Sequence, residues 1–193
     1  MISPYKIRHQ IQTLTADLIG IGLCEKQTFP SMKEIGSSVF IGTTDIDYTL
    51  FLKSISYSEM YKEARLKGYY NMLMIDGALI SLSYNFENGQ LIRHRLSFFP
   101  APHLVIFQNS PELYLEDEIY ADIIDVRIFP APIRFDYDNR SEVAIPIDHP
   151  ISHLTLGQYE FCRIPVSSAL TPQQFIFHVP GLKPSPSGEQ LSA

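Results

Sequence analysis

Apolar residues near the amino terminus recur every three or four positions, a spacing that is typical of one face of a helix. Ser3 and Pro4 precede this stripe, and Gly20 and Gly22 interrupt its far end. Because proline is favoured at the first helical position and glycine weakens a helix, we predict an amphipathic helix that opens near Ser3-Pro4 and weakens at the two glycines. The apolar stripe consists of Ile7, Ile11, Leu14, Leu18 and Ile21.

A short strand and a second helix are expected next. Residues 38–42, SVFIG, favour the strand. The segment SYSEMYKEARLKG begins at Ser56, and either Ser56 or Ser58 can cap a helix there. Glu59 suits the first turn, and Gly68 suits the position just after the last one.

The clearest pattern lies between Tyr69 and Phe99, where Asp76-Gly77 and Asn88-Gly89 divide three β-patterned runs. Both dipeptides accept the positive φ angles of tight hairpins. Strict alternation of apolar and polar residues predicts an antiparallel meander with one buried and one polar face. The apolar positions are Ala78, Ile80, Leu82, Tyr84, Phe86, Ile92, Leu96 and Phe98, and the polar ones are Ser81, Ser83, Asn85, Arg93, Arg95 and Ser97.

Later segments complete the predicted domain. Ser110 and Pro111 favour a helix start, and the alternation at 132–138 and 151–157 favours two more strands. Thr171 can cap a last helix. We therefore predict one α+β domain over residues 1–179, with an antiparallel sheet and helices packed on one face, and a disordered tail over 180–193 that is rich in Pro, Ser and Gly.

Composition narrows the class of protein. The chain has 193 residues, of which 45% are hydrophobic and 19% charged, enough for one globular core. No apolar run approaches the ~20 residues that span a bilayer, and charged residues interrupt the amino-terminal apolar positions, so we expect a cytoplasmic protein without a membrane partner. The formal net charge of −6 argues against nonspecific coating of nucleic acid, although a local basic face stays compatible with it.

The two cysteines carry little functional signal. Cys24 and Cys162 are far apart in sequence, and neither belongs to a C-x-x-C pair, so no zinc site is expected and both are expected to be reduced. Arg163 follows Cys162 without an evident local base, which favours a packed core thiol over a nucleophile.

Five segments together resemble an uncharacterised bacterial domain-of-unknown-function family, the one numbered 2290. They are YNMLMIDGALISLSYNF, HRLSFFPAP, PELYLEDEIYADII, PIRFDYD and HPISHLTLGQYEFCRIPVSSALTP, in that order between residues 54 and 175. The resemblance implies a bacterial cytosolic protein, but no activity. Family members continue after LTP with an apolar helix, whereas this chain departs from that pattern at His178, as a frameshift would make it do. Loss of that helix would leave an apolar patch exposed.

The stretch HPISHLTLGQYEFCRIP holds the first candidate site. His149 and His153, with Asp148 just before them, could form an acid/base or metal cluster, because histidine titrates near neutrality and binds metals. If 151–156 is a strand, His153 shares the polar face of the sheet rather than the core. The plainer alternative is a strand entry with a hydrogen-bonded histidine.

Arginines supply the second candidate site. Arg134 and Asp136 are two residues apart and so share a strand face, and with His153 and Arg163 they could form a catalytic group. Arg93, Arg95 and His149 could add phosphate contacts, since a guanidinium is a permanently charged fork suited to phosphate. The alternative is that these arginines pair with Asp136 and with the surface acids of YLEDEIYAD, at 116–122.

The acids Glu116, Asp117, Glu118 and Asp122 give a weaker metal hypothesis. Glu118 and Asp122 are four apart and could hold Mg²⁺ on a helix, but interleaved leucines and isoleucines are typical of a solvated helix face. We expect no resident metal, and Mg²⁺ or Mn²⁺ only if the protein is nuclease-like. The sequence lacks G-x-G-x-x-G, G-K-[ST], G-x-S-x-G and H-E-x-x-H motifs.

Two functions remain open. The first is an accessory domain that binds a protein partner, encoded on mobile or defence-related bacterial DNA. The second is a phosphodiester-handling enzyme or nucleic-acid binder, in which His153 is the acid/base, Arg134 and Arg163 stabilise phosphate charge, and Asp136 orients His153 or holds a metal.

Overall fold

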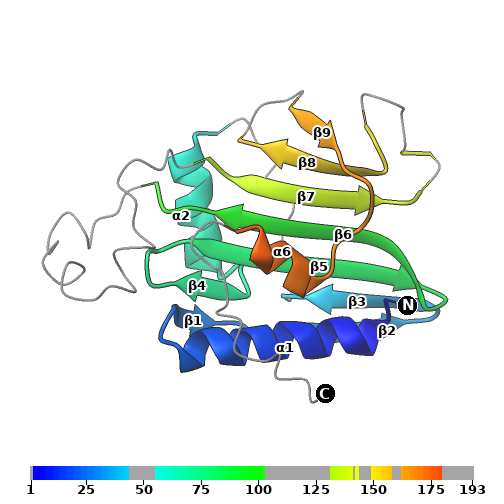
Figure 1. The fold of residues 1–193 in the computed structure, drawn as a ribbon, viewed down its shortest axis with the longest axis horizontal. Coiled ribbons are helices and arrows are strands. Elements are labelled where there is room, and N and C mark those ends of the chain that lie inside the picture. The colour runs from blue at the N-terminus through cyan, green and yellow to red at the C-terminus, as the bar shows by residue number, and fades with distance from the viewer. Residues whose placement is uncertain are drawn as a thin grey trace, which may run out of the picture.

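The computed structural model describes residues 2–43, 55–102, 131–140, 142–143, 149–157 and 162–179, and these residues form an α+β fold, as predicted (Figure 1). Within them, nine strands make one antiparallel sheet, accompanied by three helices. The helices are α1 (Pro4–Gly20), α2 (Tyr57–Lys67) and α6 (Pro172–Phe177). The strands are β1 (Cys24–Gln27), β2 (Ser31–Ile35), β3 (Ser38–Gly42), β4 (Met72–Met74), β5 (Leu79–Glu87), β6 (Gln90–Phe99), β7 (Ile133–Asp138), β8 (Ser152–Leu156) and β9 (Arg163–Pro165).

The main path of the sheet runs β1-β4-β5-β6-β7-β8-β9. Strand β5 pairs along its whole length with β6, while its other edge pairs with β4 at its beginning and with β3 at its end. The predicted meander and the strands near 132–138 and 151–157 are therefore confirmed. The hairpin between β5 and β6 turns at Asn88 and Gly89, which have φ angles of 49° and 77°, the positive values that this dipeptide predicts.

Helix ends follow the predicted capping residues. Ser56, rather than Ser58, caps α2, and Glu59 bonds back to it in a reciprocal capping box. Gly68 ends the helix in the left-handed conformation, with φ 68°. Thr171 caps α6 in the same reciprocal way with Gln174.

The main core lies between α1, α6 and one face of the sheet, and Figure 1 shows both helices on the same side. Ile80, Leu82 and Leu96 are fully buried there, so the predicted apolar face is confirmed at these positions. The prediction is wrong for Ile92, which is half-buried, because a register shift places Leu91 opposite Phe86 and packs Leu91 against the core instead. Helix α2 forms a second, smaller cluster with Leu79 and Phe99, which point to the opposite face.

The polar face of the meander is less exposed than the alternation indicates. Ser81, Ser83 and Ser97 are only 7%, 6% and 2% exposed, so these serines do not face open water. The sequence pattern also did not predict strands β1 and β2, which carry few buried residues. The predicted helix that starts near Ser110 and the predicted tail at 180–193 lie outside the described residues.

The cysteine predictions have mixed outcomes. Cys24 and Cys162 are both free, as expected. Cys162 is only half-buried, so the expected core position is wrong. The reason is that it immediately precedes β9, which is the last strand of the main sheet path and, among the described strands, pairs only with β8. Among the described helices, none is long and apolar enough to cross a membrane.

Candidate functional site

Strands β6, β7 and β8 bring three chemically active side chains into one row across the sheet. Their register places Arg95 opposite Asp136, and Asp136 opposite His153. Residues that face each other across antiparallel strands project to the same face. Asp136 therefore lies between an arginine and a histidine, on the polar face that the alternation predicted.

A second row lies beside the first. Arg134 is opposite Thr155, and Thr155 is opposite Arg163 on β9. Because Arg134 and Asp136 are two residues apart on β7, both rows share one face. We call Arg95, Arg134, Asp136, His153 and Arg163 the arginine cluster.

Asp136 organises the cluster. Its Oδ1 accepts a hydrogen bond of 2.8 Å from Nε of Arg95, and its Oδ2 accepts one of 2.6 Å from Nε of Arg134. Burial alone would raise the pKa of Asp136, but the charges and hydrogen bonds of the two arginines outweigh it and hold the pKa below its ordinary value. Asp136 is therefore a carboxylate at neutral pH, bound on both oxygens.

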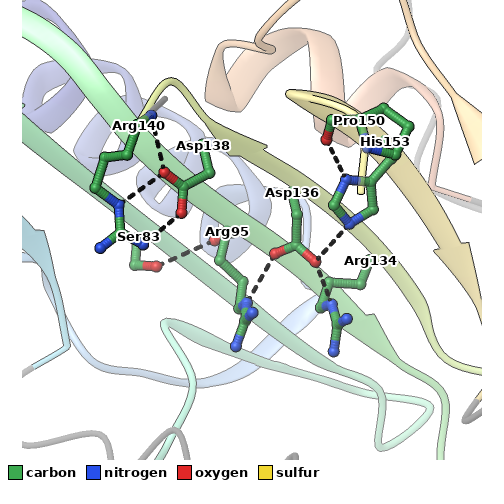
Figure 2. A network of polar contacts seen from close by, with 8 residues as sticks. All are labelled: Ser83, Arg95, Arg134, Asp136, Asp138, Arg140, Pro150 and His153. Atoms are coloured by element: carbon green, nitrogen blue, oxygen red, sulfur yellow. Dashed lines mark hydrogen bonds and ion pairs between the residues drawn. The ribbon is translucent and has the colours of Figure 1, made fainter. Parts of the chain in front are cut away.

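Arg134 keeps binding capacity beyond Asp136. Figure 2 shows both guanidinium groups beside the carboxylate, with their terminal nitrogens turned away from it. Each side chain is 21% exposed. The terminal nitrogens of Arg134 bond no side chain or carbonyl among the described residues. A guanidinium has five N–H donors, so the Nε bond of Arg134 to Asp136 leaves its other donors for a ligand.

His153 is buried at 2% exposure and held in one orientation. Its Nδ1 lies 2.9 Å from the carbonyl oxygen of Pro150. Because a carbonyl can only accept, Nδ1 carries the proton, and the free lone pair of the neutral ring is on Nε2. Nε2 is 3.7 Å from Oδ2 of Asp136, too long for a hydrogen bond.

The burial of His153 favours its neutral form. Burial lowers the pKa of His153, and His149 and Arg163 add to this, while the bond to Pro150 and the charge of Asp136 oppose it. The ring is therefore a neutral base at pH 7. Protonation of Nε2 would create an ion pair with Asp136, on the same oxygen that binds Arg134.

The described side chains of the arginine cluster have a positive sum of formal charges although the chain is acidic. Burial lowers the pKa of Arg134, and the nearby charges of Arg95 and Arg163 lower it further, while Asp136 opposes them. The three guanidiniums therefore lie close enough to repel one another. With one carboxylate and a neutral histidine, the arginine cluster carries a formal charge of about +2. That charge favours an anionic ligand.

Two predicted phosphate contacts lie at the margin of the cluster. The ring of His149 makes an edge contact with that of His153, at 5.0 Å between centroids, and its Nδ1 is buried without a partner among the described residues. Arg93 is opposite Asp138, which accepts two bonds from Arg140, of 2.9 and 2.6 Å. Arg93 thus lies beside a separate polar pair, Asp138 and Arg140, which Figure 2 shows.

The predicted metal chemistry finds little support in the described residues. No group of three or more His, Cys, Asp or Glu side chains there could hold a metal ion. Asp136 and Asp138 already use both of their oxygens for arginines. The acids at 116–122, and Asp148, lie outside the described residues, so the hypotheses of a carboxylate pair there and of arginine pairing with those acids stay untested. The other part of the ion-pair alternative, pairing with Asp136, is confirmed for Arg95 and Arg134.

Sequence reasoning missed one buried polar residue, His94. It lies on the core face of β6, opposite Tyr84 and Tyr137, and its Nε2 accepts a hydrogen bond of 2.9 Å from the backbone N–H of Leu170. Tyr84 donates to the carbonyl of the same residue, at 3.0 Å. Together they attach the segment before α6 to the core. The sequence contains a signal for its burial, because His94 occurs at an apolar position of the alternation.

Comparisons with known proteins identify a family and nothing more specific. A family model described as an uncharacterized conserved protein, DUF2290, matches residues 23–179. No curated protein matches the chain. No solved structure matches it either.

Proposed function

The chain belongs to the DUF2290 family, and we propose that it is a phosphodiester-handling domain that binds nucleic-acid phosphate through the arginine cluster. The observation that carries this proposal is the arrangement around Asp136. One carboxylate fixes two guanidiniums by Nε, and with Arg163 the side chains of the arginine cluster have a formal charge of about +2. An arginine that is held in place loses less entropy when it binds an anion.

Phosphate is the anion that fits best. Guanidinium groups bind phosphate oxygens through two parallel hydrogen bonds, which a lone halide cannot accept. The net charge of −6 opposes a nonspecific coat of nucleic acid. Binding is therefore expected to be local, with few phosphate contacts and a shallow dependence on salt.

Catalysis at the same place is part of this proposal. His153 offers a neutral Nε2 lone pair next to the arginines, which suits a general base in phosphodiester hydrolysis. Arg134 and Arg163 would then stabilise the charge that develops on the phosphate. Asp136 is occupied by arginines, so its role would be to orient them and His153 rather than to hold Mg²⁺ or Mn²⁺.

A second candidate function is an accessory domain that binds a protein partner. The observation that favours it is β9, which lies at the end of the main sheet path and carries Ile164 at 46% exposure. The free edge of a strand can pair with a strand of another chain. The proposed setting, from the family resemblance, is the cytoplasm of a bacterium, at a mobile-element or defence locus.

Binding is tested by fluorescence anisotropy with a labelled single-stranded oligonucleotide. We expect Arg134→Gln to weaken binding about 10-fold, because a hydrogen bond to a charged group contributes about 1.5–3 kcal/mol. Arg8→Gln is the matched control: it removes the same charge, but from α1, which packs on the opposite face. An equal loss of affinity in Arg134→Gln and Arg8→Gln, or no binding by the wild type, overturns the proposal.

Catalysis is tested with the same oligonucleotide in the presence and absence of Mg²⁺ or Mn²⁺. Cleavage by the wild type that His153→Ala abolishes, with binding retained, supports the enzyme. Binding without cleavage under all conditions refutes the catalytic part and leaves a binding domain. If the wild type captures a protein partner and Ile164→Pro abolishes that capture, the result would support the accessory function instead.

A further inference from the structure

His153 lies beside the carboxylate oxygen that holds Arg134. Its Nε2 is 3.7 Å from Oδ2 of Asp136, and the same oxygen accepts the hydrogen bond of 2.6 Å from Nε of Arg134. These two distances place the two nitrogens no more than about 6 Å apart, a range in which one charge changes the energy of another. A proton on His153 therefore changes the electrostatic potential at Arg134, the residue proposed to bind phosphate.

The ring can take up that proton without a change in its orientation. Nδ1 stays bonded to the carbonyl oxygen of Pro150, so Nε2 is the nitrogen that gains the proton. Figure 2 shows Nε2 turned toward Asp136. A carboxylate oxygen has two lone pairs, so Oδ2 can accept from Arg134 and from a protonated His153 together. A movement of less than about 1 Å would shorten the contact to a hydrogen bond.

The described groups that act on His153 come from three segments of the chain. Burial lowers the pKa of the ring most, and His149, before β8, and Arg163, on β9, lower it further. The Pro150 carbonyl and the charge of Asp136, on β7, oppose them. A phosphate bound to Arg134 would be a second negative charge near the ring, and would raise the pKa of His153 in the same way as Asp136 does.

We propose that proton uptake by His153 regulates phosphate binding at the arginine cluster, so that nucleic-acid phosphate is bound more tightly as the pH falls below 7. This inference rests on the proposed function and adds the regulation of the same site. The coupling is reciprocal: the bound anion stabilises the protonated ring, and the protonated ring stabilises the bound anion by the same amount. The proton adds one positive charge whichever groups the arginines bind, so the sign of the effect does not depend on their partners. Because the neutral ring is the proposed general base, cleavage falls as binding tightens.

Fluorescence anisotropy with a 5′-hydroxyl oligothymidylate between pH 8 and pH 5 tests the inference. The diester phosphates and the bases of this strand keep their charge over that range, so a change in affinity arises in the protein. We expect the affinity of the wild type to rise by up to about 10-fold as the pH falls, the factor that corresponds to one pKa unit. His153→Gln should lose most of that rise. His9→Gln, which removes an exposed histidine from α1, is the matched control and should keep it.

Two further measurements distinguish regulation from a structural role of the buried ring. Calorimetric titration near pH 6, in two buffers that differ in ionisation enthalpy, gives the number of protons taken up on binding. We expect net uptake by the wild type and less by His153→Gln. NMR titration of the wild type needs no variant, and the pKa of the His153 ring should be higher with oligothymidylate bound than without it.

The outcomes separate this inference from the proposed function. An affinity that does not change with pH, or a ring pKa that is equal in the free and bound protein, overturns the inference and leaves the phosphate-binding face in place. A rise that survives in His153→Gln assigns the proton to another group and also overturns it, and loss of the rise in His149→Gln would identify that group. No binding at any pH overturns this inference and the proposed function together.

Discussion

His94 makes the stability of this fold depend on pH. Burial lowers its pKa from 6.5 to about 4, although the charge of Asp136 and two backbone groups oppose this. The ring packs between Tyr84 and Tyr137, with centroids 5.5 and 5.7 Å away. Its Nε2 must stay unprotonated to accept the N–H of Leu170. Protonation would thus break a buried hydrogen bond and place a charge in the core.

The magnitude follows from the two pKa values. The unfolded chain takes up the proton near pH 6.5 and the folded protein only near pH 4, so the contribution of His94 is complete above about pH 6.5 and declines as the pH falls toward 4. At 1.36 kcal/mol for each pKa unit, the full loss is about 3 kcal/mol, of which about 2 kcal/mol is lost by pH 5.

Urea unfolding between pH 7.5 and pH 5 measures this loss. We expect the wild type to lose about 2 kcal/mol more than His94→Gln over that range. His9→Gln, which removes an exposed histidine from α1, is the matched control. If His94→Gln does not fold, NMR titration of the His94 ring in the wild type replaces it. A ring that titrates near 6.5, or a wild-type stability that is flat over this range, refutes the reasoning.

Three further changes should destabilise the protein in urea unfolding. Asp136→Asn should lower the free energy of unfolding by about 3 kcal/mol, because it leaves two partly buried guanidiniums without their shared carboxylate. A loss below about 1 kcal/mol would contradict the role assigned to the Asp136 carboxylate. Tyr84→Phe should cost about 1 kcal/mol through the lost bond to the Leu170 carbonyl, and an unchanged midpoint would contradict it. Gly68→Ala should cost about 1 kcal/mol from its left-handed φ of 68° alone, since a Cβ there meets no atom within 4 Å, and a stabilising effect would contradict it.

The sequence predicted which faces its strands present, because period-two alternation depends on local order alone. It placed Arg134, Asp136 and His153 on the polar face without any knowledge of their neighbours. The register could not be predicted. Arg95 and Asp136 are 41 residues apart, and their pairing depends on how β6 and β7 align across a long connection.

Other features of the structure were not predicted from the sequence, for different reasons. Strands β1 and β2 have almost no buried positions, so they lack an apolar alternation to reveal them. His94 was overlooked although its place in the alternation puts it on the core face with Leu96. The predicted face of the serines on β5 and β6 is right, but their predicted exposure is wrong, because alternation does not say what covers a polar face.

The central claim is that the arginine cluster binds phosphate on the polar face of β6 to β9. Calorimetric titration of the wild type and Arg134→Gln with a 5′-phosphorylated single strand tests it most directly. The account predicts one saturable site, about 10-fold weaker in Arg134→Gln and weaker again as salt is raised. Identical titrations for the two proteins, or no heat of binding to the wild type, would contradict it.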